Sequence, residues 1–175
     1  MRLLPHAPNA TPITAIAFVS SLYLGKRWSI ILPCIALLLS DAIIGLYDWK
    51  IMLSVYGSFI LIGCLSWLSS KYRSFLSIGV SVVSASLIFF LITNGAVWLF
   101  SPWYEKTVSG LLYSYELGLP FLRNMLTGDM AYTIALIGAF KIYHAISHEN
   151  NQVLLWHKTG LTLTHLRYFV LNHPY

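Results

Sequence analysis

The sequence predicts an all-α integral membrane protein: a helical bundle of about five spans with a short re-entrant or interfacial hairpin. Two features of composition predict this class. The chain of 175 residues is 57% hydrophobic and only 10% charged, whereas a soluble domain carries roughly 25% charged residues. Its mean hydropathy is +0.69. In addition, the apolar residues gather into runs near the length of about 20 residues that a membrane helix needs.

Five apolar runs are candidate spans, and the first is somewhat short. In chain order they cover about residues 10–25, 28–47, 51–69, 75–100 and 129–147. The N-terminus does not have the layout of a signal peptide, because Pro5, Pro8 and Pro12 interrupt its first apolar residues. We therefore expect a polytopic membrane domain over residues 1–147.

The tail, residues 148–175, has no apolar run of spanning length. It is expected to be cytoplasmic or interfacial. It either lies along the inner membrane surface, docks on a partner or is disordered.

The fourth run is longer than a bilayer requires. Its 26 residues would extend for about 39 Å as a helix, against a hydrocarbon core of about 30 Å. Asn94 and Gly95 are poor in helix interiors and common at helix ends. The sequence therefore predicts that this helix ends or breaks between Leu91 and Trp98, with Asn94 at the exit.

A polar, aromatic segment follows that exit and precedes Gly128. Trp98, Trp103 and Tyr104 suit an interfacial aromatic belt. Residues 106–118 are too few to span the membrane as a helix, and Pro120 is expected to end any helix that forms there. We interpret this segment as the re-entrant or interfacial hairpin.

The charge distribution predicts the orientation. With the N-terminus outside, seven basic residues are cytoplasmic and four are external, which agrees with the positive-inside rule. The cytoplasmic ones are Lys26, Arg27, Lys71, Arg73, Lys141, Lys158 and Arg167. The external ones are Arg2, Lys50, Lys106 and Arg123.

Several function classes are disfavoured by what the sequence lacks. It has no Lys/Arg run for nucleic acid, no P-loop, and no G-x-S-x-G, H-E-x-x-H or C-x-x-C motif, so we expect no nucleic-acid partner, no enzyme and no cofactor. His144 and His148 are four apart, but two ligands make a weak site, so no metal is expected. Cys34 and Cys64 lie in apolar runs and are expected to be packing residues.

Four motifs carry a resemblance to known proteins. They are P-N-x-T-P, S-D, T-N-x-x-x-W and L-P-F…G-D, within "LPHAPNATPITAIAFVSSLYLG", "LPCIALLLSDAIIG", "FFLITNGAVWL" and "LPFLRNMLTGDMAYTIAL". Over about residues 3–146 the chain resembles a family of uncharacterised bacterial membrane proteins. That family is similar in turn to the S components of energy-coupling-factor (ECF) vitamin transporters, most closely at the segment that opens the last helix of biotin-type S components.

The resemblance implies a location and partners. It implies a multi-pass protein of the bacterial inner (plasma) membrane, with substrate contacts on the outer side. It also implies a separate transmembrane coupling subunit with ATPases. S components have six helices, and relatives carry an apolar helix before P-N-x-T-P, so this chain is expected to lack the usual first helix. That helix contacts the coupling subunit in S components.

The candidate substrate-binding residues are Asn94, Trp98, Tyr104, Tyr113, Glu116, Asp129, Asp41 and Asn9. Each has a structural alternative. Asn94 and Trp98 form either a ring-binding corner or a helix C-cap with an interfacial Trp. Asp41 is either functional or a helix-end carboxylate paired with Lys50.

The remaining candidates are equally open. Glu116, with Tyr113 one turn earlier, faces either a pocket or solvent. Asp129 either contacts a ligand or is the N-cap of the last span. Asn9 and Thr11 are candidate caps of the first span.

Two functions fit these residues. The first is a substrate-binding membrane subunit for uptake of a small, vitamin-like nutrient, aromatic or heterocyclic. In it Asn94 lines an outer pocket, Trp98 stacks on the ligand, and Glu116 or Asp129 forms the polar end under the hairpin. The alternative is a structural or assembly membrane protein with no small-molecule ligand, in which these residues anchor the hairpin.

Overall fold

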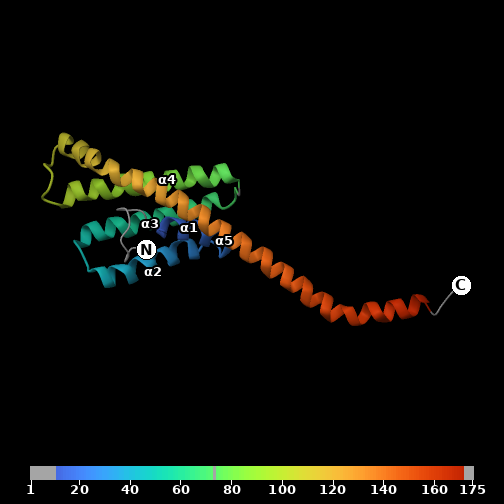
Figure 1. Ribbon diagram of the computed structural model, residues 1–175. Coiled ribbons are helices and arrows are strands. Elements are labelled where there is room, and N and C mark those ends of the chain that lie inside the picture. The colour runs from blue at the N-terminus through green and yellow to red at the C-terminus, as the bar shows by residue number, and fades with distance from the viewer. Residues whose placement is uncertain (1–10, 73, 172–175) are drawn as a thin grey trace. The chain divides into compact units, whose positions relative to one another are not determined.

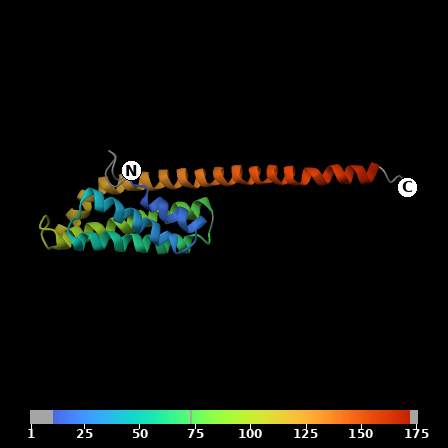
Figure 2. The same cartoon turned by 90° about the horizontal axis from the view of Figure 1, so that it is seen from below.

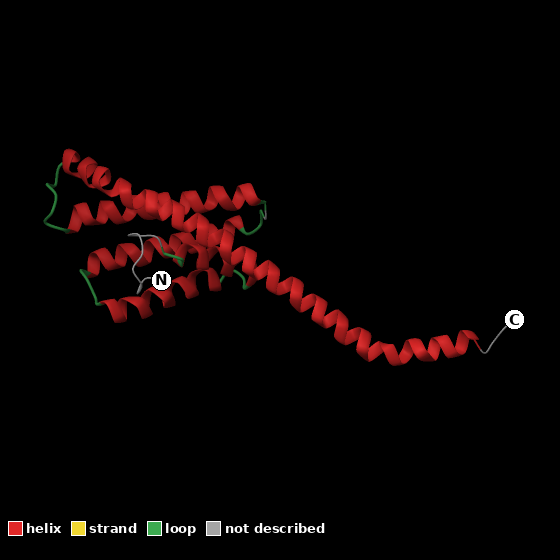
Figure 3. Cartoon of the chain, viewed as in Figure 1, coloured by secondary structure: helices red, strands yellow, loops and turns green. Residues whose placement is uncertain are grey.

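Every regular element that the structure describes is a helix (Figure 3). The computed structural model describes residues 11–72 and 74–171, with side chains as far as residue 147. The helices are α1 (Ile13–Tyr23), α2 (Trp28–Ile44), α3 (Trp49–Ser69), α4 (Phe75–Phe100) and α5 (Val108–Leu171). The prediction of an all-α chain is confirmed.

Three helical segments are long and apolar enough to cross a membrane: α3, α4 and Val108–Ser147 of α5. α1 has 11 residues and α2 has 17, fewer than the roughly 20 that a span needs. The expected five spans are therefore three long helices and two shorter apolar ones. Large apolar side chains such as Ile35, Leu38 and Leu53 are exposed, which is compatible with a membrane protein whose surface faces lipid.

The chain divides into two units, Met1–Leu136 and Ile137–Tyr175. The first contains α1–α4 and the start of α5, and the second contains the rest of α5. In the second unit the Tyr143 ring lies edge-on to His144, with 5.9 Å between centroids. The side chain of His148 lies outside the described residues, so the possible histidine pair is not tested.

In the first unit, α1 contacts α2, α3 and α4. The helices run side by side and are joined by short turns (Figures 1 and 2). Gly25 ends the turn after α1 at φ 96°, and Gly45 follows α2 at φ 114°, a backbone region that glycine adopts without strain. The side chain of Asp48 caps α3 by accepting from the backbone N–H of Lys50 and Ile51.

Two lysine side chains make cation–π contacts at opposite ends of this bundle. Lys26, after α1, lies 4.3 Å from the ring centroid of Trp67 near the end of α3. Lys50, at the start of α3, lies 5.4 Å from the ring of Phe100 at the end of α4.

Small residues bring α2 and α3 into close contact. A Cβ on Gly63 would lie 2.6 Å from Cγ1 of Ile30 and 2.8 Å from the carbonyl oxygen of Ser29. The Ser29 hydroxyl donates to the Gly63 carbonyl at 3.0 Å. In lipid, close packing and interhelical hydrogen bonds replace the hydrophobic effect as the force that joins helices.

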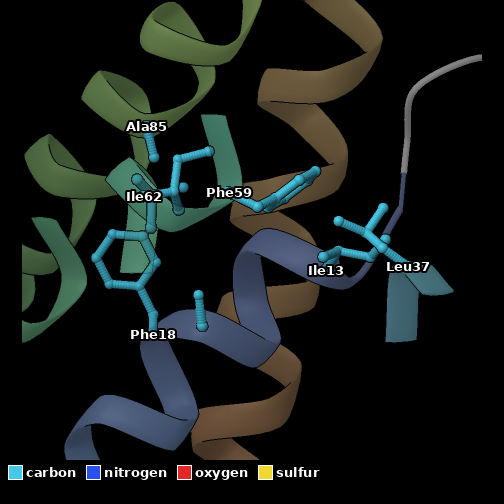
Figure 4. Close-up of a cluster of buried hydrophobic side chains, with 8 residues drawn as sticks. Ile13, Phe18, Leu37, Phe59, Ile62 and Ala85 are labelled. Carbon is cyan, nitrogen blue, oxygen red and sulfur yellow. The ribbon is translucent and has the colours of Figure 1, made fainter. Parts of the chain in front are cut away.

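An apolar cluster fills the space between α1 and its neighbours (Figure 4). Phe18 of α1, Ile62 of α3 and Ala85 of α4 point toward one another in this view. Phe59 packs against Phe89 with 5.2 Å between ring centroids. Ile13 and Leu37 extend the cluster toward the start of α1.

The prediction that the fourth helix breaks near Asn94 is wrong. α4 runs unbroken over 26 residues from Phe75 to Phe100. The start of α5 packs against it there: the Tyr115 hydroxyl donates to the Leu91 carbonyl at 3.1 Å, and its ring lies 5.6 Å from that of Phe90. The Nδ2 of Asn94 donates to the Phe90 carbonyl of its own helix, so the amide does not have to leave α4 to find a partner.

The predicted re-entrant hairpin is also corrected. Residues 101–107 form a short loop, and α5 begins at Val108 and continues through Pro120. Proline is tolerated inside a membrane helix because neighbouring helices and local adjustments satisfy the freed carbonyl. The segment that was expected to form the hairpin is therefore a short loop followed by the first turns of α5.

Candidate functional site

A cavity of about 60 Å³ lies within the first unit. Its walls come from the start of α1 and from α2, α3, α4 and α5. The lining residues are Thr11, Ile13, Thr14, Leu37, Val55, Phe59, Phe89, Met125 and Asp129. One water needs roughly 10–15 Å³ of such space, so the cavity has room for a few waters or a compact ligand.

Asp129 is the polar end of this cavity. Its side chain is only 1% exposed. Oδ2 accepts a hydrogen bond of 2.8 Å from the hydroxyl of Ser86 on α4, and the Thr14 hydroxyl of α1 lies beside the carboxyl group. Oδ1 has no hydrogen-bond partner. Leaving a buried acceptor unpaired costs about 1–3 kcal/mol, and more if it is charged.

A second unpaired oxygen lies one helical turn further along α5. The hydroxyl of Thr133 is buried and has no hydrogen-bond partner. Residues four apart share a helix face, so Thr133 and Asp129 lie on the same side of α5. Among the described residues, these are the two buried side-chain oxygens that lack a partner. Thr133 is not one of the residues that line the cavity.

The charge of Asp129 has no counterpart on the cavity wall. Of the residues described as lining it, Asp129 alone is ionisable. The nearest compensating feature is the start of α1, where Pro12 occupies the N-cap without a side-chain cap. The positive end of the helix dipole favours an anionic group there. The arrangement is suited to bind a hydrogen-bond donor or a positive charge.

The position of Asp129 excludes its structural alternative. It lies in the interior of α5, 21 residues after Val108, so it is not the N-cap of the last span. Likewise Thr11 is not the N-cap of α1, because Pro12 occupies that position.

Asn94 is an interior residue of α4 and not a helix end. Its Nδ2 donates to the carbonyl of Phe90 in the preceding turn at 2.9 Å. Its Oδ1 faces α5, where a Cβ on Gly118 would lie 2.6 Å from it. Asn94 is thus a packing residue between α4 and α5, and it is not part of the cavity wall.

The aromatic candidates lie together around the loop between α4 and α5. The indole N–H of Trp98 donates to the Glu105 carbonyl at 2.8 Å. Tyr104 and Tyr113 meet edge to face, with ring centroids 6.2 Å apart. The Lys106 ammonium donates to the carbonyls of Trp98 and Ser101. These contacts secure the loop, away from the residues that line the cavity.

The remaining candidate residues that the structure describes lie neither on the cavity wall nor in the contacts around the loop between α4 and α5. Glu116 is exposed on α5. Asp41 is 1% exposed, and its Oδ2 accepts from the Tyr56 hydroxyl at 3.1 Å, but it does not line the cavity. Asn9 lies outside the described residues. The structure therefore brings one candidate, Asp129, to the cavity.

A model of a family of unknown function, DUF6580, matches residues 1–152. The chain belongs to this family. No curated protein and no solved structure matches it. The family match extends from the start of the chain past Asp129, so the whole cavity falls inside it.

Sequence reasoning missed two residues of this site, Thr14 and Ser86. Each is a hydroxyl side chain inside an apolar run, and such residues usually bond to their own helix backbone. The sequence carries no signal that joins them to Asp129, because the three residues are far apart in the chain.

Proposed function

We propose that this chain is a substrate-binding membrane subunit for uptake of a small, vitamin-like nutrient, and that the nutrient binds at the cavity of Asp129. The observation that carries the proposal is the unpaired Oδ1 of a fully buried carboxyl group at a cavity wall. A cavity with apolar walls and a few convergent polar groups is what small-ligand binding needs.

The size of the cavity restricts the nutrient. About 60 Å³ is less than the roughly 150 Å³ cavity that binds benzene. It accommodates a compact molecule, or the polar end of an aromatic or heterocyclic one. Apolar walls from Phe59 and Phe89 would contact the carbon atoms, and Asp129 would contact a donor group.

The resemblance to ECF S components supports a role in transport. The L-P-F…G-D segment that carries it includes Asp129 itself. In this proposal a separate transmembrane coupling subunit with ATPases completes the transporter, since the sequence has no P-loop of its own. The location that we propose is the bacterial inner membrane.

A second candidate function is a structural or assembly membrane protein without a ligand. It is favoured by the loop contacts, because Trp98, Tyr104, Tyr113 and Lys106 find partners in one another and in nearby backbone carbonyls. Because these side chains already have partners within the protein, no ligand is needed to account for their presence around the loop.

Mass spectrometry of the full chain, gently purified in detergent, separates the two functions. We expect a bound small molecule in the wild type and in Trp98→Phe, and its loss in Asp129→Asn. Adding the identified molecule at 100 times its Kd should stabilise the wild type by about 2.7 kcal/mol. If the wild type carries no small molecule and no candidate nutrient changes its melting temperature, the proposal is wrong and the structural role is favoured.

A further inference from the structure

We propose that the cavity at Asp129 binds a compact monovalent cation, which is either an alkali-metal ion or the ammonium group of a small amine. Oδ1 of Asp129 and the hydroxyl of Thr14, both from residues on the cavity wall, would coordinate it. This inference deepens the proposed function and rests on it in one respect, since it takes the same cavity to be the binding site.

The first reason is charge. A buried carboxylate with no counterion is unfavourable by several kcal/mol. Asp129 is 1% exposed, and none of the other residues described on the cavity wall is ionisable. A single negative charge is balanced by one positive charge. A divalent ion is disfavoured, because the described residues contain no group of three or more His, Cys, Asp or Glu side chains that could hold a metal.

The second reason is the chemistry of the polar atoms. The polar atoms of Asp129 and Thr14 at the cavity, the carboxyl Oδ1 and the threonine hydroxyl, are oxygens. Oxygen is the ligand that hard cations take, and it also accepts from an N–H group. Oδ2 is already engaged by Ser86. That contact fixes the carboxyl group, while Oδ1 has no hydrogen-bond partner.

The third reason is size. The cavity of about 60 Å³ is well below the roughly 150 Å³ that admits a benzene ring. A bare or partly hydrated alkali ion fits, and so does a methylammonium-sized group. The walls formed by Leu37, Val55 and Phe59 are apolar, and low polarity strengthens the attraction between the carboxylate and a cation.

A proton on Asp129 is the competing explanation. A protonated carboxyl group would need no cation, and an amide would replace it with little change. The two explanations therefore differ in how Asp129→Asn responds to salts.

The test is thermal unfolding of the purified full chain at constant ionic strength. The chlorides of sodium, potassium, ammonium and methylammonium are compared with choline chloride, whose cation is too large for the cavity. We expect at least one small cation to raise the melting temperature in a concentration-dependent way. Asp129→Asn should abolish this difference. Ser84→Ala, on the same helix as Ser86 but bonded to the Val80 carbonyl, should retain it.

Thr14→Val provides a variant that keeps the carboxylate and removes a hydroxyl from the cavity wall. Loss of one oxygen ligand should raise the half-effective cation concentration about tenfold. This variant also carries the test if Asp129→Asn fails to fold. A response to alkali ions alone supports a bound metal ion, and a response to ammonium and methylammonium alone supports an amine nutrient.

Two results would overturn the inference: a wild type in which no small cation differs from choline, or an undiminished response in Asp129→Asn. Its failure is distinct from that of the proposed function. A bound nutrient without any cation response rejects the inference alone. A cation response without a bound nutrient or uptake rejects the nutrient-binding function alone.

Discussion

Ser86 and Asp129 join α4 to α5 through one buried hydrogen bond, with 2.8 Å between the serine hydroxyl and Oδ2 of the carboxyl group. Both side chains are at most 1% exposed. Because one carboxyl oxygen is engaged and the other is not, this bond sets which oxygen faces the cavity. Ser86 is therefore a positioning residue for the site.

Ser86→Ala is expected to destabilise the protein. Removing the donor leaves a second buried carboxyl oxygen unpaired, which should cost about 1–3 kcal/mol. Thermal or denaturant unfolding in detergent measures this loss. Ser84→Ala is the matched control: like Ser86, which also reaches the Val82 carbonyl, its hydroxyl bonds to a carbonyl of its own helix, but the bond to Asp129 is made by Ser86. Its effect should stay within about 0.5 kcal/mol. Equal effects of the two substitutions would show that the bond to Asp129 contributes nothing.

Gly63→Ala is expected to loosen the contact between α2 and α3. The added Cβ would lie 2.6 Å from Cγ1 of Ile30 and 2.8 Å from the Ser29 carbonyl oxygen. The side chain can rotate away but the backbone must shift, so we expect a cost of about 1–3 kcal/mol. Gly57→Ala on the same helix meets nothing within 4 Å and should be neutral or stabilising by up to about 1 kcal/mol. Unfolding curves in which Gly63→Ala is as stable as Gly57→Ala would contradict the close packing.

Gly118→Ala and Asn94→Ala are expected to compensate each other in part. The methyl group of Gly118→Ala would approach Oδ1 of Asn94 to 2.6 Å and Cε2 of Phe90 to 2.8 Å. Shortening Asn94 removes the first of these clashes. A double-mutant cycle should therefore give a favourable coupling of about 0.5–3 kcal/mol.

Two further measurements complete that prediction. Asn94→Ala alone should leave ligand and cation binding unchanged, since Asn94 does not line the cavity. Gly79→Ala is the control, because its Cβ would meet only Cε of Met130 at 3.9 Å. Strictly additive effects of Gly118→Ala and Asn94→Ala would show that the two positions are not in contact.

The predicted orientation is tested by thiol labelling of intact cells. In a background with Cys34 and Cys64 replaced by alanine, Leu46→Cys should react with a membrane-impermeant reagent and Lys71→Cys should not. Both positions are exposed, and the charge bias places the first outside and the second in the cytoplasm. Lysed cells, in which both should react, provide the control. Labelling of Lys71→Cys alone in intact cells would reverse the orientation.

The composition and the length of the apolar runs were sufficient to predict the helices, because a chain in lipid has few other ways to pair its backbone groups. Each exposed backbone group must be paired within its own segment, so the apolar runs around Ile62 and Val82 had to be helical. The ends of helices were harder to predict. Asn94 and Pro120 are residues that commonly end helices. In this protein α4 continues past Asn94 and α5 continues through Pro120.

The sequence by itself determined the all-helical class, the order of the helices and Asp129 as one of a few candidate residues. It did not determine which polar side chains meet, because Thr14, Ser86 and Asp129 are far apart in the chain and come together only through packing of α1, α4 and α5. Tertiary structure decided that Ser86 satisfies one oxygen of Asp129 and that Oδ1 stays unpaired at a cavity. The physical reason is that helix formation depends on neighbouring residues, whereas the pairing of a buried polar atom depends on which helix lies against it.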